Sequence, residues 1–111
     1  MESVDALTLA GHGPVWGTAS ADLNATVLAW RAGEGQPEHV NVERDVAIVV
    51  VEGSGTITVD DGALEVAAGT LVIVPRGARR SVVAGPDGLR CVTVHLRREG
   101  LEITRLPPDD G

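Results

Sequence analysis

The chain has 111 residues and a formal net charge of −7, and 43% of its residues are hydrophobic. This length suits one domain with a single core, and the hydrophobic share excludes intrinsic disorder. The acidic balance argues against non-specific binding to nucleic acid or to an anionic membrane surface.

Aromatic residues and cysteine are scarce. The chain contains two tryptophans, no phenylalanine, no tyrosine and one cysteine, Cys91. A core made of valine, leucine, isoleucine and alanine favours β structure. A single cysteine excludes an intramolecular disulfide and a zinc cluster held by thiolates, and we interpret Cys91 as a buried small side chain rather than a nucleophile. Together with the absence of a secretory pattern in residues 1–25, this predicts a cytoplasmic protein.

The first part of the chain is irregular. Residues 1–25 contain a turn cluster at 11–14, in which His12 is expected to be solvent-exposed, and a loop over 18–24. We expect this segment to pack on the main domain. The first clear strand covers residues 26–31 and is followed by a glycine-rich loop that ends at Pro37.

A site is predicted in the stretch 38–53, EHVNVERDVAIVVVEG. Polar residues occupy every second position at His39, Asn41, Glu43 and Asp45, and an apolar run follows over 46–51. Because side chains alternate between the faces of an extended chain, these four residues are expected to project from one side of one strand. Polar groups that converge at the edge of an apolar core are typical of a binding pocket.

Short strands continue along the rest of the chain, separated by turns rich in Gly, Pro and Asp. They are predicted at residues 56–59, 63–66, 71–74, 80–84, 89–96 and 101–106. The strand at 71–74 is expected to be buried, and the Asp60–Asp61–Gly62 turn predicts a tight hairpin. Eight or nine strands without helical periodicity predict an all-β sandwich or barrel over 26–106, with a frayed tail at 107–111.

The spacing of glycine, proline and histidine over 27–96 resembles that of the cupin family. The first cupin motif is matched in part and the second in its frame, at Gly33, His39, Asn41, Gly53, Gly69, Pro75, Gly77 and Arg80. The resemblance implies the cupin jelly-roll barrel, a double-stranded β-helix. It also implies a homodimer, because cupins commonly pair through their sheets.

The departures from the motifs concern the metal site. Typical metal cupins hold Fe, Mn, Ni or Zn with two His and one Glu of the first motif and one His of the second. Here Asn41 stands at the second His position, Asp45 or Val46 at the Glu position, and Arg80 at the His position of the second motif. A guanidinium keeps its proton and cannot ligate a metal. The comparison with the family therefore implies no metal cofactor; a metal, if present, would use His39, Glu43 and His95.

Two orientations remain open at this point. Arg80 is expected to point into the barrel and to pair with Glu43 or Asp45, although a solvent-facing arginine at a strand start is the alternative. His95 shares the face of Cys91 and Thr93, opposite Val92 and Val94. The face that fills the barrel therefore decides whether His95 lies inside or outside.

Three functions are compatible with this pattern. The first is a metal-free cupin that binds a small polar or anionic ligand through Arg80, His39 and Asn41, with Glu43, Asp45 and His95 nearby. Such a protein could be a sensor, a carrier or an isomerase with His39 as general base, so whether it is an enzyme stays open. The alternatives are a metal-dependent oxygenase or isomerase using His39, a carboxylate and His95, and a dimeric interaction module with an idle pocket. No nucleic-acid or membrane partner is expected.

Overall fold

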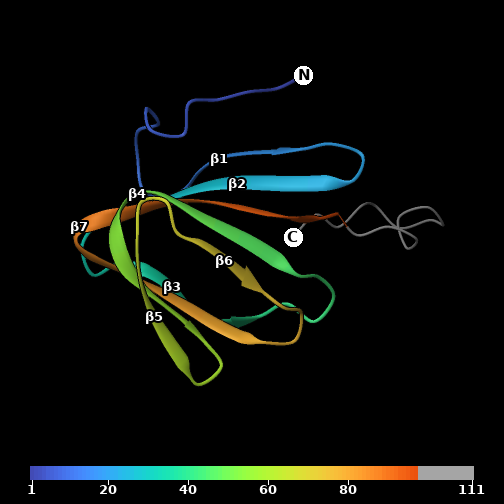
Figure 1. Ribbon diagram of the computed structural model, residues 1–111. Helices are drawn as coiled ribbons and strands as arrows, with labels where there is room; N and C mark the ends of the chain where they lie inside the picture. Colours follow the sequence, from blue (N-terminus) through green and yellow to red (C-terminus); the bar gives the residue numbers. More distant parts are fainter. Residues whose placement is uncertain (98–111) are drawn as a thin grey trace.

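The computed structural model describes residues 1–97, and these residues form seven β-strands (Figure 1). The strands are β1 (Gly13–Ala19), β2 (Leu23–Trp30), β3 (Gly35–Val40), β4 (Val46–Val59), β5 (Gly62–Ala67), β6 (Leu71–Val74) and β7 (Arg79–Leu96). Within the described part of the chain, no helix has the length and apolar character needed to cross a membrane. The strand expected at 101–106 and the tail at 107–111 lie outside the described residues.

Two long, bent strands connect the two layers of the fold. The second half of β7 lies between β2 and the first half of β4, with β1 and β6 at the edges of this layer. The first half of β7 lies between β3 and the second half of β4, and β5 completes the other layer. Figure 1 shows the two layers facing each other and joined where β4 and β7 bend. This antiparallel arrangement confirms the predicted double-stranded β-helix.

Glycines bend β4 and β7 at points where turns between separate strands were expected. Gly53 has a φ of 82°, and a Cβ atom there would lie 2.1 Å from the carbonyl oxygen of Gly88. The pairing of β4 with β7 shifts register on both sides of Gly53 but continues beyond it. A β-bulge re-aims a strand without ending it, so each pair of expected strands is one strand in the structure.

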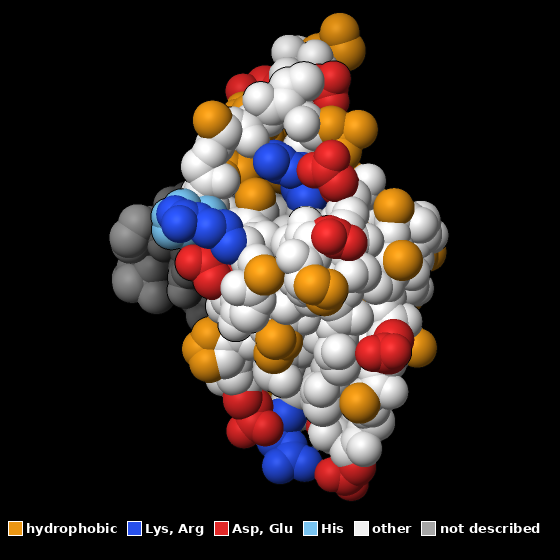
Figure 2. Space-filling model, turned by 90° about the vertical axis from the view of Figure 1, so that its left-hand side faces the viewer, with side chains coloured by type: hydrophobic (Ala, Val, Ile, Leu, Met, Phe, Trp, Pro, Cys, Tyr) orange, Lys and Arg blue, Asp and Glu red, His pale blue; other side chains and the backbone are white. Residues whose placement is uncertain are grey.

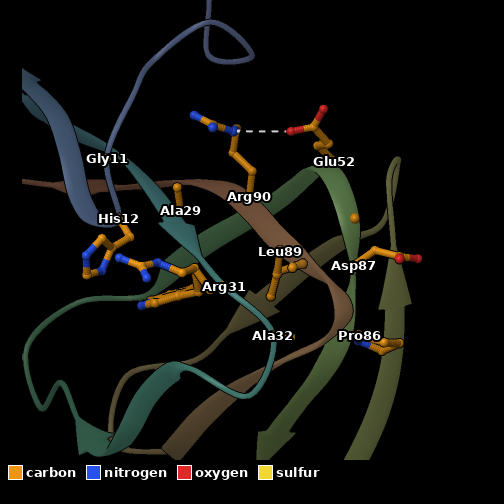
Figure 3. A pocket seen from close by; sticks show the side chains of 13 residues that line it. Gly11, His12, Ala29, Arg31, Ala32, Glu52, Pro86, Asp87, Leu89 and Arg90 are labelled. Atoms are coloured by element: carbon orange, nitrogen blue, oxygen red, sulfur yellow. Dashed lines mark ion pairs between the residues drawn. The ribbon is translucent and has the colours of Figure 1, made fainter.

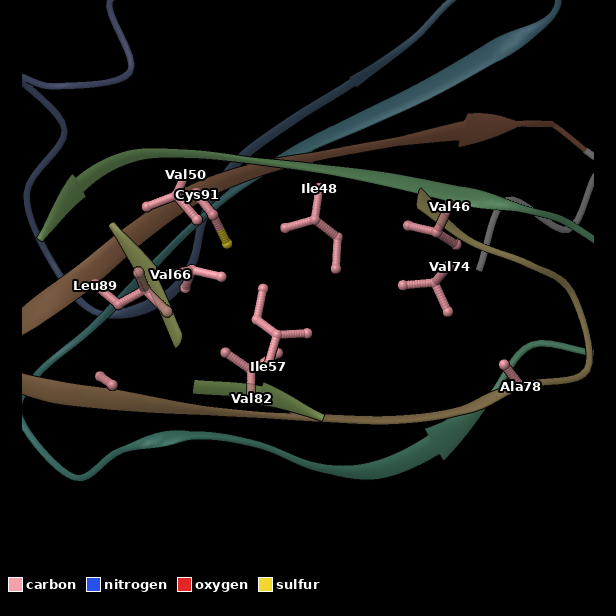
Figure 4. Close-up of a cluster of buried hydrophobic side chains, with 11 residues drawn as sticks. Val46, Ile48, Val50, Ile57, Val66, Val74, Ala78, Val82, Leu89 and Cys91 are labelled. Atoms are coloured by element: carbon pink, nitrogen blue, oxygen red, sulfur yellow. The ribbon is translucent and has the colours of Figure 1, made fainter. Parts of the chain in front are cut away.

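The core lies between the two layers. Val46, Ile48 and Val50 of β4 are each 1% exposed and alternate with half-buried residues. Figure 4 shows them pointing from one layer toward Ile57 and Val82 of the other. This alternation assigns the even-numbered residues of the first half of β4 to the inner face.

The strand β6 differs from its prediction. Leu71 and Ile73 are 60% and 58% exposed, whereas Val74 is buried. This strand pairs with β4 at an edge of the sheet, and only one of its faces meets the core. The apolar composition of 71–74 could not distinguish a fully buried strand from an edge strand whose outer face is also apolar.

The N-terminal segment contributes a strand and a contact to the barrel. β1 covers Gly13–Ala19, which includes residues expected to form a loop, and it pairs with β2 along its whole length. Upstream of β1, the Arg90 guanidinium donates a hydrogen bond to the carbonyl oxygen of Ala6 at 3.1 Å. Short strands with few apolar residues, such as β1, carry a weak pattern in sequence.

Candidate functional site

His39 and Arg80 are direct neighbours on two adjacent strands. They are register partners in the antiparallel pair β3–β7, so their side chains leave the sheet on the same face, with Cβ atoms about 4.5–5.5 Å apart. Arg80 lies on the same face of β7 as Val82 and Ala84, both of which are buried in the core. The inner-face orientation predicted for Arg80 is therefore the one observed, and His39 is exposed beside it.

Arg80 is a buried cation. Its residue is 9% exposed, and the buried Nε atom has no hydrogen-bond partner among residues 1–97. Burial lowers the pKa of the Arg80 guanidinium from its usual value, because desolvation disfavours the charged form. A protonated arginine in this position is an electrostatic cost that a nearby anion would offset.

The ion pair predicted for Arg80 is not formed by the residues that the structure describes. Asp45 accepts a hydrogen bond from the backbone N–H of Arg76 at 2.9 Å instead. Asp45 and Glu43 are both exposed, and together with Arg44, Arg76 and Leu96 they line a separate cleft of ≈ 300 Å³. Glu43 and Asp45 therefore lie at the surface and do not neutralise Arg80.

Asn41 explains why the four alternating polar residues do not share one face. β3 ends at Val40, and the Asn41 Oδ1 atom accepts hydrogen bonds from the backbone N–H groups of Glu43 and Arg44 at 3.0 and 3.1 Å. Such a turn, in which an asparagine side chain bonds the following backbone, competes with strand structure. The prediction that His39, Asn41, Glu43 and Asp45 project from one side of one strand is therefore wrong.

His95 lies on the inner face of the other layer. It lies on the same face of β7 as Leu89 and Cys91, which belong to the core, and its Nδ1 atom lies 3.0 Å from the carbonyl oxygen of Leu96. This settles the orientation left open by the sequence: the face of Cys91 fills the barrel, and Val92 and Val94 point outward. Burial also raises the pKa of the Cys91 thiol to about 11, which does not suit a nucleophile.

Asn24 is a polar inner-wall residue that the sequence reading missed. It is 7% exposed and is the register partner of His95 across the β2–β7 pair. The sequence predicts a loop over residues 18–24, and a loop residue is not expected on an inner wall. The signal was present in the alternation of β2, in which Asn24, Leu28 and Trp30 occupy one face and the last two pack against the core.

The residues present do not fit a cupin metal ion. The donors named for a metal, His39, Glu43 and His95, lie on β3, on the turn after it and near the end of β7. Over residues 1–97 the structure brings no three His, Cys, Asp or Glu side chains together in a group that could hold a metal. The Arg80 guanidinium also occupies the inner wall where the motif would place a histidine, and it would repel a cation.

Comparisons with known proteins agree with this fold. A family model described as "Cupin domain" matches residues 27–95. A cupin protein from Bacteroides fragilis has a TM-score of 0.71 and 20% identity, covering 92% of this chain and 91% of its own. The protein TT1209 from Thermus thermophilus has a TM-score of 0.77 and 23% identity, covering 86% of this chain and 97% of its own. At these identities the solved structures show the fold alone.

One curated relative carries an activity in its name. Dimethylsulfoniopropionate lyase DddW from Ruegeria pomeroyi is 45% identical over 40 residues, which are 36% of this chain and 26% of the lyase. The aligned stretch therefore spans about a quarter of that relative's length. The match of the family model over most of the chain, with the two-layer barrel described above, shows that this chain belongs to the cupin domain family.

Proposed function

We propose that this cupin binds a small anionic molecule at the inner wall of the barrel, with Arg80 as the principal binding group and without the usual metal. The observation that carries the proposal is that Arg80 is only 9% exposed, that its buried Nε atom has no hydrogen-bond partner, and that it forms no ion pair among residues 1–97. A carboxylate, phosphate or sulfate group is the natural complement of this planar fork.

The electrostatics support a ligand rather than a purely structural role. A buried arginine that stabilises a fold is normally paired, because an unpaired buried charge costs several kcal/mol. Proteins retain such locally unfavourable features mainly where function requires them. A bound anion would recover the lost interaction in an environment where charge-assisted hydrogen bonds are stronger than in water.

His39 is the second binding group of the proposed site. It lies on the strand next to Arg80 and on the same face, and it is exposed, so it remains accessible to a ligand and to solvent. Imidazole is a common general base in proteins, so His39 is the candidate for that role if a reaction follows binding. Asn41 can bind a ligand only through its side-chain NH₂ group, because its side-chain oxygen accepts the hydrogen bonds of the turn after β3.

The test is the stabilisation of the protein by simple anions. Phosphate, sulfate, acetate and citrate would be titrated at constant ionic strength while thermal unfolding is recorded. An anion present at a hundredfold its dissociation constant stabilises the folded protein by about 2.7 kcal/mol. We expect at least one of these anions to do so in the unmodified chain and to lose the effect in Arg80→Met.

Arg79 provides the matched control, because it neighbours Arg80 on β7 but is exposed. Its side chain pairs with Asp60 and Asp61 at 3.9 and 3.7 Å. Arg79→Met removes one positive charge from the same strand and should leave the anion effect intact. An equal loss in both variants, or an undiminished effect in Arg80→Met, would refute binding at Arg80.

We further propose that the protein acts as a homodimer through the outer face of the layer that contains β6. Leu71 and Ile73 are more than half exposed on that face, and large exposed apolar side chains mark interaction surfaces. A second copy can cover them through a twofold contact of like surfaces. Light scattering should give a dimer that Ile73→Lys converts to a monomer, and a monomeric unmodified protein would refute the idea.

The reducing cytoplasm remains the proposed location, consistent with the buried, unpaired Cys91.

A further inference from the structure

The outer faces of the two layers differ in polarity. On the layer of β2, β7, β4 and β6, outward-pointing residues form two register rows across the sheet, Ala25–Val94–Ala47–Ile73 and Val27–Val92–Val49–Leu71. All of these residues are aliphatic. On the other layer, Thr56 and Thr58 of β4 and Ser81 of β7 point outward. Strands that are apolar on both faces are typical of a sheet that is covered on both sides.

The N-terminal segment, residues 1–12, covers the β2 side of this apolar face. Val27 and Ala29 point away from the core cluster, yet they are only 2% and 5% exposed. The start of the segment, at Met1, lines a cleft together with Ala25, and its end, at Gly11, lines another cleft together with Ala29. Figure 1 shows the segment running outside β1 and β2. The segment therefore follows β2 along its outer side.

Side-chain contacts hold the segment in this place. The Arg90 guanidinium donates to the carbonyl oxygen of Ala6 at 3.1 Å, and its Nε atom lies 3.4 Å from the carboxylate of Glu52. Near the start of the segment, the Thr18 hydroxyl donates to the carboxylate of Glu2. Figure 3 shows Arg90 directed toward the segment and paired with Glu52. Figure 2 views this end of the molecule and shows the segment projecting above acidic and basic side chains that lie side by side.

The rest of the apolar face stays accessible in the part of the chain that the structure describes. Leu71 and Ile73 are 60% and 58% exposed, and Ala47, Val49 and Val94 beside them are half-buried. This band covers β7, β4 and β6, with β4 in its middle. Contiguous apolar surface of this kind marks an interaction site.

We propose that the N-terminal segment sets the geometry of the homodimer proposed above, on which this inference rests. Because the segment closes the β2 side, a second copy packs on β7, β4 and β6, with the twofold axis along β4. Sheets that pack face to face keep their strands roughly aligned, and a twofold axis exchanges the strands on its two sides. Ala47 then lies on the axis, and Ile73 faces Val94 of the partner subunit. With the β2 side open, the axis would lie between β7 and β4, and Ile73 would face Ala25 of the partner subunit.

The test is chemical cross-linking of cysteine variants of the full chain, with a thiol cross-linker that spans about 10 Å, the spacing of packed sheets. Cys91, the one cysteine of the chain, is buried. We expect Ala47→Cys to cross-link to itself. Ile73→Cys alone should not, because its two copies are also offset sideways by two strand spacings, about 10 Å. A mixture of Ile73→Cys and Val94→Cys chains should give at least threefold more cross-linked dimer than a mixture of Ile73→Cys and Ala25→Cys chains.

Val83→Cys is the matched control for chance cross-linking, because Val83 is 51% exposed on the outer face of the other layer. It should give no cross-linked dimer. In a dimeric protein, self-cross-linking of Ile73→Cys, no cross-linking of Ala47→Cys, or a higher yield with Ala25→Cys than with Val94→Cys would overturn the proposed geometry alone. A monomeric unmodified protein, which would leave this surface to another occupant, would overturn the homodimer as well.

Discussion

Replacing Arg80 with methionine should stabilise the protein in the absence of ligand. Arg80 is 9% exposed and forms no ion pair among residues 1–97, so the substitution leaves no carboxylate of this region unpaired. The methionine side chain retains most of the apolar contacts that the arginine stem makes with the core. The difference between the two side chains is therefore dominated by the desolvated charge.

The expected gain follows from that difference. The effective penalty of a buried ion is several kcal/mol, and replacement of buried charged groups by apolar side chains of similar volume has stabilised proteins by about 1–4 kcal/mol. We expect a gain within this range for Arg80→Met. Had Arg80 been paired with Glu43 or Asp45, as its motif position suggested, the same substitution would instead cost about 3–5 kcal/mol. The two arrangements therefore predict opposite signs.

Urea unfolding followed by tryptophan fluorescence measures this change, in a buffer without phosphate, sulfate or carboxylates. Arg79→Met is the control, since its surface ion pairs with Asp60 and Asp61 are worth about 0–1 kcal/mol. A loss of about 3 kcal/mol or more in Arg80→Met would refute the reasoning, because it would mean that a buried carboxylate depends on this arginine. The sign of the change in the free energy of unfolding thus shows whether Arg80 is unpaired in the ligand-free protein or forms an internal ion pair.

Further predictions concern the turn after β3, the bend of β4 and the buried thiol of Cys91. Asn41→Ala should lower the free energy of unfolding by about 1 kcal/mol, because two backbone N–H groups lose their acceptor. Asn41→Asp keeps an acceptor oxygen and should lower it little. Thermal unfolding of both variants measures the difference, and equal losses would contradict the prediction. Gly53→Ala should lower the free energy of unfolding by at least ~2 kcal/mol, since its Cβ atom would clash with a backbone oxygen. Gly69→Ala is the control, because Gly69 also has a positive φ but has open space around its Cβ position. A larger loss of stability in Gly69→Ala than in Gly53→Ala would refute the clash. Burial raises the pKa of the Cys91 thiol to about 11, so the unfolded chain, with a thiol pKa near 8.5, loses its proton first. Stability should be complete below about pH 8.5 and should fall by ~3 kcal/mol as the pH rises to 11; a Cys91→Ala chain that shows the same loss in urea titrations across this range would exclude the thiol as its cause.

Local patterns in the chain predicted the fold and the inward orientation of Arg80. β-branched runs bounded by glycine and proline indicated an all-β barrel, and the motif frame that includes Gly69, Pro75 and Gly77 placed Arg80 on the inner wall. These features are local, because strand alternation and turn chemistry depend on residues close in the chain. The tight Asp60–Gly62 connection was predicted for the same reason, and the structure pairs Val59 with Gly62 across it.

The tertiary structure decided which charged groups meet. The alternation of His39 with Glu43 and Asp45 suggested a shared face, but the side chain of Asn41 turns the chain and moves the carboxylates to the surface. Arg80 lies instead between His39 of β3 and Val59 of β4, which are far from it in the sequence. Pairing between distant strands depends on how the whole barrel closes, so the amino-acid sequence alone determined which side chains face inward at many positions but not which of them would lie together.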